Sequence, residues 1–262
     1  MSTTLSFKAQ KAAGEKISCL TVYDASFAQV IAEAGVDLFL VGDSLGMVVQ
    51  GQETTLPVSL DEMIYHAAAV RRGAPNNFII VDMPFMSYAT PEIALKSAGK
   101  IMKRSGANMV KLEGGSEMLE TIAALSSRGI PTCGHLGLLP QSVHKLGGYR
   151  VQGKTEASAN KLIEDAVALE TAGVDMLVLE CVPATLAEKI SKQVEIPVIG
   201  IGAGVGCDGQ VLVLYDMLGI SKGKRPKFSK NFMDGRASIS DAIKAYSHAV
   251  KSKEFPGQEH SF

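Results

Sequence analysis

The sequence repeats one short unit: a helix-ending glycine, a polar turn residue, a mainly apolar run and then an acidic residue. Three copies occupy residues 34–43, 105–113 and 172–180. The clearest apolar run, residues 38–41, shows no polar alternation, which is the pattern of a strand buried on both faces of a parallel sheet. It stops abruptly at Gly42, Asp43 and Ser44. The repeat therefore predicts recurring strand–helix units with a carboxylate where each of these strands ends.

About eight such units are expected along the 262 residues, with no break in composition that would divide them. The predicted strands are residues 17–22, 38–41, 78–81, 109–113, 130–135, 176–180, 196–204 with a glycine-rich exit, and 211–215. Helices are expected at residues 25–34, 59–72, 90–105, 116–129, 156–172, 183–194 and 238–251.

This alternation favours an α/β fold, a (β/α)8 TIM barrel. Residues 1–262 would form a single barrel domain with a polar N-terminal extension and a C-terminal helix and tail. A doubly wound open sheet is the alternative fold. Residues 211–215 could also continue a helix that begins at Asp208 rather than form the eighth strand.

The composition limits the possible classes of function. The 26 basic and 27 acidic residues are interspersed, with a formal charge of −1, so neither a nucleic-acid surface nor an acidic interaction tail is expected. The N-terminus lacks the apolar segment of a signal peptide, and no run approaches membrane-spanning length. The four cysteines lie far apart without a CxxC pair, which predicts buried, reduced thiols. We therefore expect a cytoplasmic protein.

Three acidic residues follow consecutive predicted strands: Asp43, Asp82 and Glu113. Residues at the carboxyl ends of barrel strands converge on one mouth, so these three become neighbours. Carboxylates brought together without a cation repel one another and take up protons. An all-oxygen set with room for water suits Mg²⁺ better than zinc. The sequence predicts a Mg²⁺ site, and the alternative is that single acids cap the next helix or pair with Lys111.

Three more ionisable residues belong to the same strand ends. Lys111 lies two residues before Glu113 and so points to the same side of its strand, where it can neutralise a substrate carboxylate or an enolate. His135 leaves the fifth strand and could donate to a substrate oxygen. Glu180 leaves the sixth strand, across the mouth from the proposed metal acids, a position suited to a general base. The alternatives are a purely structural ion pair for Lys111 and a structural role for His135.

Two glycine-containing segments have open interpretations. Residues 136–155 have the length and hinge composition of an active-site lid, although a subunit contact would use the same features. Residues 200–204 lack the spacing of a dinucleotide-binding motif, so close packing at the barrel rim is the favoured interpretation.

Seven ordered stretches resemble the ketopantoate hydroxymethyltransferase family. They are residues 41–51, 66–75, 82–88, 111–115, 133–138, 199–204 and 255–262, so the resemblance extends over essentially the whole chain. The fold of that family, a (β/α)8 barrel of the phosphoenolpyruvate mutase and isocitrate lyase type, agrees with the predicted alternation. Its members make 2-dehydropantoate from 3-methyl-2-oxobutanoate and 5,10-methylenetetrahydrofolate, in pantothenate and coenzyme A biosynthesis.

The resemblance implies a role for each polar residue at the strand ends. It implies that Glu180 is the proton acceptor and that the Mg²⁺ site consists of Asp43, Asp82 and Glu113. The residues implied to contact the keto acid are Asp43, Ser44, Asp82 and Lys111, with His135 nearby. Members of the family are decamers, so a homodecamer that binds small molecules, but neither nucleic acid nor a membrane, is expected.

Two alternatives belong to other classes of function. A Mg²⁺-dependent lyase on the same barrel would cleave a C–C bond in a 2-oxo or 2-hydroxy acid. A diacid substrate would need a second cationic pocket, normally an arginine, and no arginine follows a predicted strand. A barrel kept only for binding or assembly is disfavoured by five ionisable groups on five strands, since such groups are costly to bury without use.

Overall fold

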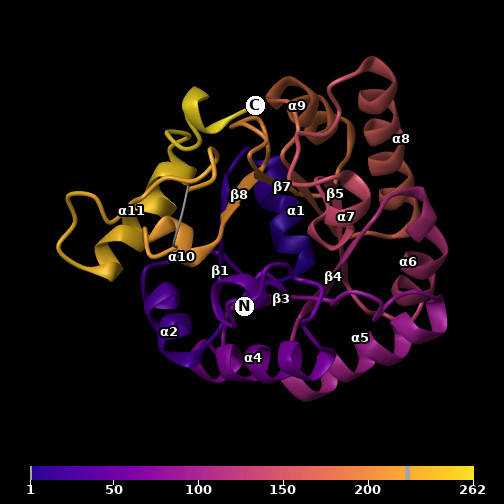
Figure 1. Cartoon of the computed structure of the whole chain (residues 1–262), viewed down its shortest axis with the longest axis horizontal. Helices are drawn as coiled ribbons and strands as arrows, with labels where there is room; N and C mark the ends of the chain where they lie inside the picture. Colours follow the sequence, from indigo (N-terminus) through magenta and orange to yellow (C-terminus); the bar gives the residue numbers. More distant parts are fainter. Residues whose placement is uncertain (1, 222–224) are drawn as a thin grey trace.

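The computed structural model describes residues 2–221 and 225–262, and eight parallel strands in it close into a barrel in chain order, β1 to β8. Helices surround the barrel (Figure 1). The predicted (β/α)8 barrel is confirmed. The strands are β1 (Ile17–Thr21), β2 (Leu38–Val41), β3 (Phe78–Asp82), β4 (Met109–Glu113), β5 (Thr132–Gly137), β6 (Met176–Glu180), β7 (Val198–Ile201) and β8 (Gly209–Leu212).

The helices lie between the strands and at both ends of the chain. The longer ones are α1 (Thr4–Ala12), α2 (Ala25–Glu33), α4 (Leu60–Gly73), α5 (Pro91–Ser105), α6 (Leu119–Ser126), α8 (Glu156–Ala172), α9 (Ala184–Gln193) and α11 (Ile239–Lys251). The short ones are α3 (Leu45–Val48), α7 (Val143–Leu146), α10 (Leu214–Met217), and the 3₁₀ turns η1 (Ser116–Met118), η2 (Pro140–Ser142) and η3 (Gln258–His260). None of the helices in the described residues is both long and apolar enough to cross a membrane.

Alternate side chains of the strands fill the inside of the barrel, because successive residues of a strand point to opposite faces. The inward-facing cluster consists of Phe7 from α1 and of Ile17, Cys19, Leu38, Leu40, Phe78, Ile80, Met109, Cys133, Met176, Val178, Ile199, Ile201 and Val211 from the strands. The other side chains pack outward against the helices in a second, larger cluster. This alternation decides which residues at the strand ends can enter the mouth.

Two sequence expectations are corrected by the structure. Residues 4–12, expected to be part of a polar extension, form α1, which begins with a Thr3 capping box. The eighth strand is Gly209–Leu212 and not residues 211–215, because the chain turns into α10 at Leu214. Gln210 pairs with both Ser18 and Gly200, so β8 closes the barrel between β1 and β7.

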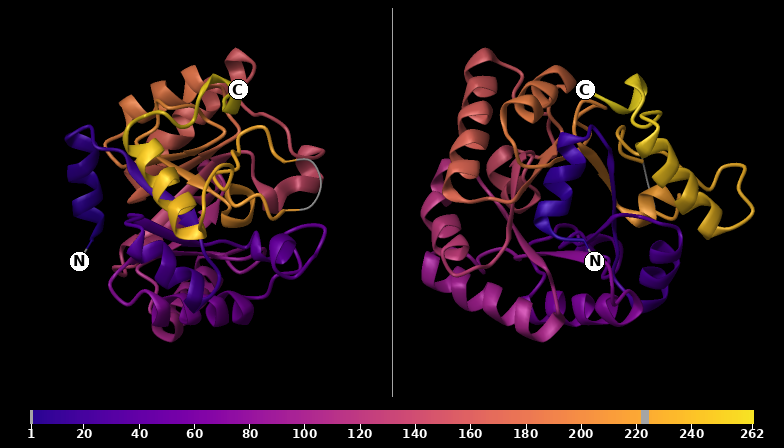
Figure 2. Two further views of the ribbon diagram at one scale, coloured as in Figure 1. Left: turned by 90° about the vertical axis from the view of Figure 1, so that its left-hand side faces the viewer. Right: turned by 180° about the vertical axis from the view of Figure 1, so that it is seen from behind.

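Helix α1 covers the end of the barrel opposite to the mouth (Figure 2). Phe7 is 1% exposed and packs edge to face on Phe78, the first residue of β3. Lys11 ties the helix to the loop before β8 through an ion pair with Asp208 at 2.9 Å. Since this end is closed, a ligand has access to the interior only from the carboxyl ends of the strands.

Close helix packing sets the spacing of the outer ring between α2 and α4. A Cβ added at Gly73, the last residue of α4, would lie 2.1 Å from the backbone oxygen of Ala25. A glycine is therefore required where α4 meets the first turn of α2. Gly99 in the middle of α5 has no heavy atom within 4 Å of such a Cβ.

The two glycines give a matched pair of stability predictions. Gly73→Ala forces two backbones apart and is expected to lower the free energy of unfolding by about 1–3 kcal/mol. Gly99→Ala meets no obstacle and is expected to raise it by about 1 kcal/mol, through helix propensity alone. Urea denaturation of both variants measures the effects. A stable Gly73→Ala protein would contradict the close α2–α4 contact.

Candidate active site

Five ionisable side chains continue the inward-facing positions of their strands. Each comes an even number of residues after an inward-facing core residue of its own strand. On β3, Asp82 follows Phe78 and Ile80, and on β4, Lys111 and Glu113 follow Met109. On β5, His135 follows Cys133, and on β6, Glu180 follows Met176 and Val178. Apolar residues therefore fill the lower layers of the barrel, and charged residues form its last layer at the mouth. The sequence predicted all five at this end, and the structure brings them together.

Asp43 enters the mouth in a different way. The inward position after Leu40 on β2 belongs to Gly42, and Asp43 comes one residue later, in the turn that leads into α3. A Cβ on Gly42 would lie 2.9 Å from the Ser44 hydroxyl and 3.5 Å from Asp82 Oδ2. Glycine thus leaves room for the backbone N–H of Asp43 to donate to Asp82 Oδ2 at 3.1 Å.

The groups form one connected network. Lys111 Nζ lies 2.9 Å from Asp82 Oδ1 and 3.4 Å from His135 Nδ1. His135 Nδ1 lies 3.5 Å from Glu113 Oε1, and His135 Nε2 lies 3.3 Å from Glu180 Oε2. The side chain of Glu180 is 14% exposed, against 3–5% for the other four groups, so it is the most accessible.

Negative charge exceeds positive charge in this buried layer. Burial, together with the carboxylates of Asp82 and Glu113, raises the pKa of Asp43 well above its usual range. Burial alone would lower the pKa of Lys111, but Asp82, Glu113 and Asp43 outweigh it and raise that pKa. Lys111 is therefore a permanent cation, and the acids around it remain short of positive charge.

Opposing effects act on the pKa of His135. Burial and the ammonium group of Lys111 lower its pKa, whereas the nearby carboxylates of Glu113 and Glu180 raise it, and the net shift is upward. The ring links the group of acids on β2 to β4 with Glu180 on β6. A histidine in this position can hold or pass a proton between the two sides of the mouth.

Gln141 in η2 is a site residue that the sequence analysis missed. Its side chain is buried and its Nε2 donates to Asp43 Oδ2 at 2.8 Å and to the Met83 carbonyl at 3.0 Å. Its backbone N–H donates to Glu113 Oε2 at 3.0 Å, and its Oε1 accepts from the Tyr88 hydroxyl. No periodicity marks a single glutamine in a long loop, so no local signal could have found it.

The donor set fits a hard cation, although the ligands are not yet gathered around one point. Asp43, Asp82 and Glu113 offer only carboxylate oxygens, and the excess of negative charge would be balanced by a divalent ion. Across residues 2–221 and 225–262, no three His, Cys, Asp or Glu side chains form a group that could hold a metal as they lie. Gln141 lies between two of these acids, since its side-chain amide donates to Asp43 and its backbone N–H donates to Glu113.

The remaining sequence expectations concern the rim of the mouth. Ser44 is half-buried and its hydroxyl bonds to that of Tyr23 at 2.9 Å. The expected lid contains η2 and α7, and beyond them the hydroxyl of Tyr149 lies 3.5 Å from the sulfur of Met47, on the β2 side of the mouth. In the glycine-rich exit of β7, Gly202 packs closely against Phe228 and Phe262, which confirms a packing role there.

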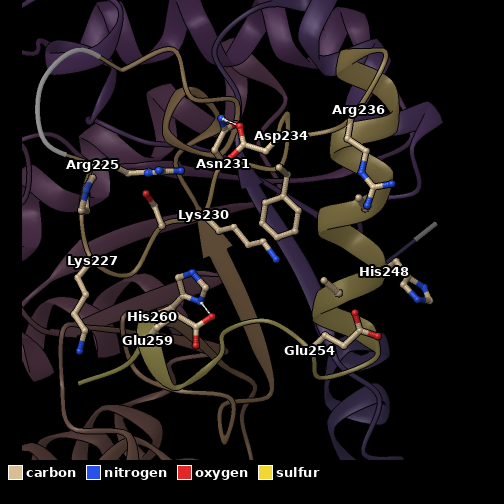
Figure 3. Close-up of a pocket in the computed structure, with 15 residues that line it drawn as sticks. Arg225, Lys227, Lys230, Asn231, Asp234, Arg236, His248, Glu254, Glu259 and His260 are labelled. Carbon is tan, nitrogen blue, oxygen red and sulfur yellow. Dashed lines mark hydrogen bonds and ion pairs between the residues drawn. The ribbon is translucent and has the colours of Figure 1, made fainter.

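A pocket larger than the space beside the mouth network lies elsewhere in the described residues. It has a volume of about 600 Å³ and lies between the 225–236 segment, α11 and the C-terminal tail. Basic side chains such as Arg225, Lys227 and Lys230 surround it (Figure 3). It contains none of the residues of the mouth network.

A (β/α)8 barrel whose mouth holds acids, a lysine and a histidine in one buried network has the architecture of an enzyme. The family model described as ketopantoate hydroxymethyltransferase matches residues 1–258. The chain belongs to the ketopantoate hydroxymethyltransferase family, and it is an enzyme of the transferase class.

Named relatives are similar over nearly the full length. A 3-methyl-2-oxobutanoate hydroxymethyltransferase of Nitrosococcus oceani is 58% identical over 260 residues, which cover 99% of this chain and 98% of that protein. One of Nitrosospira multiformis is 58% identical, covering 98% and 97%.

More distant solved structures share the fold. A phosphonopyruvate hydrolase in complex with oxalate and Mg²⁺ has a TM-score of 0.64 at 12% identity, covering 97% of this chain and 96% of that one. A 2,3-dimethylmalate lyase, of the phosphoenolpyruvate mutase and isocitrate lyase superfamily, has a TM-score of 0.59 at 19% identity, covering 84% and 83%. Both share the (β/α)8 barrel fold with this chain.

Replacing Gln141 tests whether it holds the network together. Gln141→Ala removes the donor to Asp43 and Met83 and is expected to lower the free energy of unfolding by about 1–3 kcal/mol, because buried acceptors lose their partner. The matched control is Gln152→Ala, whose amide donates only to the exposed Arg150 carbonyl and should change stability by less than about 0.5 kcal/mol. Calorimetric melting of both variants measures the difference. Equal stability would show that the Gln141 contacts contribute nothing.

Proposed function

We propose that this protein transfers a hydroxymethyl group from 5,10-methylenetetrahydrofolate to 3-methyl-2-oxobutanoate, giving 2-dehydropantoate, in a Mg²⁺-dependent reaction. The observation that carries the proposal is the connected layer of Asp82, Lys111, Glu113, His135 and Glu180 at the barrel mouth. The names of the relatives support the keto acid as the substrate. The layer contains the three functions that the reaction needs, which are an acid cluster for a cation, an ammonium group and a proton acceptor.

The keto acid substrate would bind at the metal side of the mouth. The ammonium group of Lys111, fixed by its ion pair with Asp82, can contact a substrate carboxylate or carbonyl oxygen. The Ser44 hydroxyl, at the beginning of α3, offers a further hydrogen bond. The proposed holders of Mg²⁺ are Asp43, Asp82 and Glu113, and bound Mg²⁺ would supply Lewis-acid polarisation of the 2-oxo acid.

Glu180 is the proposed general base. It is the most accessible acid of the network and lies across His135 from the acids on β2 to β4. It would take the C3 proton of the keto acid, while Lys111 stabilises the negative charge that develops on the enolate oxygen. Water releases the one-carbon unit of the folate as formaldehyde and leaves tetrahydrofolate. The nucleophilic C3 then adds to the formaldehyde carbon, whose oxygen takes up a proton and becomes the new hydroxyl group. His135, with its raised pKa, can accept or return the proton held by Glu180.

The lyase alternative shares the barrel and the acid cluster. Barrels of this type with the names of lyases and hydrolases match at 12–19% identity, which shows only a common fold. The relatives at 58% identity carry the name of the hydroxymethyl transferase. We therefore favour one-carbon transfer over C–C cleavage of a 2-oxo or 2-hydroxy acid.

The family also suggests the cellular setting. We propose a role in pantothenate biosynthesis, upstream of coenzyme A, for a cytoplasmic enzyme that assembles as a homodecamer. Sedimentation velocity in Mg²⁺-containing buffer would measure the mass of the assembly directly.

Exchange of the C3 proton of 3-methyl-2-oxobutanoate in D₂O tests the base without the folate. The parent enzyme with Mg²⁺ is expected to exchange this proton, and Glu180→Gln is expected to do so about 10²–10⁴-fold more slowly. Proton NMR of the substrate follows the reaction.

The control variant is Glu164→Gln, which changes an exposed acid on α8. It should exchange at the parent rate. Exchange that persists in Glu180→Gln would remove Glu180 as the base and make His135 the next candidate.

Removal of divalent ions tests the metal site by a readout other than activity. Mg²⁺ at 100 times its dissociation constant should stabilise the parent by about 2.7 kcal/mol, because it binds only the folded protein. Asp43→Asn and Asp82→Asn should lose most of this gain. Thermal melting in EDTA and in Mg²⁺ measures it. A Mg²⁺-dependent shift of equal size in both variants would place the ion elsewhere.

A further inference from the structure

A second pocket opens directly beside the mouth network. Its volume is about 170 Å³, and it shares Glu113 and Gln141 with the network. It lies between the loop that follows β3, the η1 turn after β4, and η2 in the lid segment. A ligand in it would therefore touch the wall of the proposed keto acid site.

Apolar side chains form the walls of the pocket. Phe85 and Met86 in the β3–α5 loop are 46% and 61% exposed, although they are large hydrophobic residues. Met86 has a φ of 64°, in the left-handed region that only a few per cent of non-glycine residues adopt. Strained residues and exposed apolar side chains both concentrate at binding sites. Tyr88, Met118 and Leu139 complete the apolar lining.

A carboxylate lies on the outer side of the pocket. Glu117 is exposed, and its Oε1 accepts from the backbone N–H of Gly115 at 3.0 Å. A Cβ on Gly114 would lie 2.8 Å from that oxygen and 2.7 Å from Met118 Cγ, so glycine is required for this arrangement. Glu117 Oε2 makes no hydrogen bond or ion pair within residues 2–221 and 225–262. One carboxylate oxygen is thus fixed and the other is available.

We propose that this pocket holds the reduced pterin ring of the one-carbon donor. The inference rests on the proposed function, in which the donor is a folate. The pterin is flat and largely apolar on its faces, which suits the walls formed by Phe85 and Met86. Its 2-amino group is a hydrogen-bond donor, and the available Oε2 of the Glu117 carboxylate is the acceptor that matches it.

The position of the two glutamates orients the ring. Glu117 on the exposed side engages the aminopyrimidine edge, so the opposite, one-carbon-bearing edge points inward to Glu113 and Gln141. Gln141 also bonds to Asp43, so this inner end adjoins the site proposed for the keto acid. The aminobenzoyl-glutamate part of the donor is attached at this same inner edge through N10, so it lies outside the 170 Å³ pocket and leads out along the mouth of the barrel.

Binding of a fragment that contains only the pterin ring tests the pocket assignment separately from the proposed function. 6-Methyltetrahydropterin is expected to compete with 5,10-methylenetetrahydrofolate, whereas p-aminobenzoylglutamate is not. Glu117→Gln is expected to weaken binding of the fragment and raise the KM for the folate by about 10- to 100-fold, since the amide retains the Gly115 acceptor but opposes the 2-amino group with its own N–H. Phe85→Ala should weaken binding of the fragment about tenfold and raise the KM for the folate by a similar factor.

Matched controls and a folate-free readout complete the experiment. Glu120→Gln and Tyr65→Ala change an exposed acid on α6 and an exposed aromatic residue on α4 outside the pocket, and should leave fragment binding unchanged. C3 proton exchange should remain at the parent rate in every pocket variant, which shows that the keto acid site is intact.

Calorimetric binding of the fragment decides the proposal even if turnover is absent. Unchanged fragment affinity in Glu117→Gln and Phe85→Ala, with exchange intact, would overturn the pocket assignment and leave the proposed function standing. A raised KM for the keto acid instead of the folate would assign the pocket to the substrate's alkyl group. A parent enzyme that neither exchanges the C3 proton nor transfers the one-carbon unit would overturn the proposed function itself.

Discussion

Closure of the parallel barrel is the constraint on which the rest of the structure depends. Eight strands paired in chain order fix the position of each residue relative to its neighbours, and alternate side chains must then face the interior. The lower inward layers are apolar and hold the barrel together. The same alternation, continued by one or two residues, brings acids, a lysine and a histidine from four strands into one small space. The site is therefore a direct consequence of the register of the core.

Burying these ionisable groups close together costs free energy, and it also changes the pKa values on which their chemistry depends. Lys111 is the one permanent cation in the described layer, and it stays charged because the carboxylates around it outweigh its burial. Burial first, and then the carboxylates of Asp82 and Glu113, raise the pKa of Asp43. Gln141 supplies neutral donors to two of them, Asp43 and Glu113. A divalent ion would provide the missing charge. Gln141 also lines the pocket beside the network.

Much of the site was predictable because its signals are local. A helix-ending glycine, an apolar run and a terminal acid lie within ten residues of one another, so Asp82, Glu113 and Glu180 could be placed at strand ends without knowledge of the fold. The barrel then required them to converge. The eighth strand was misplaced because the apolar residues around Leu214 serve both β8 and α10, and only pairing with β1 and β7 decides where the strand ends.

The sequence by itself determined the alternation of strands and helices, the fold class and the ionisable residues of the mouth, since each depends on short-range patterns of apolar and polar residues. Only the tertiary structure decided that residues 4–12 form α1, which closes the far end of the barrel, because that role depends on the contact of Phe7 with Phe78, 71 positions away. It also decided that Gln141 reaches Asp43 across 98 residues of chain, and that Glu117 and Phe85 line one pocket. These contacts exist only once closure of the barrel has brought the loops of separate strands to one end.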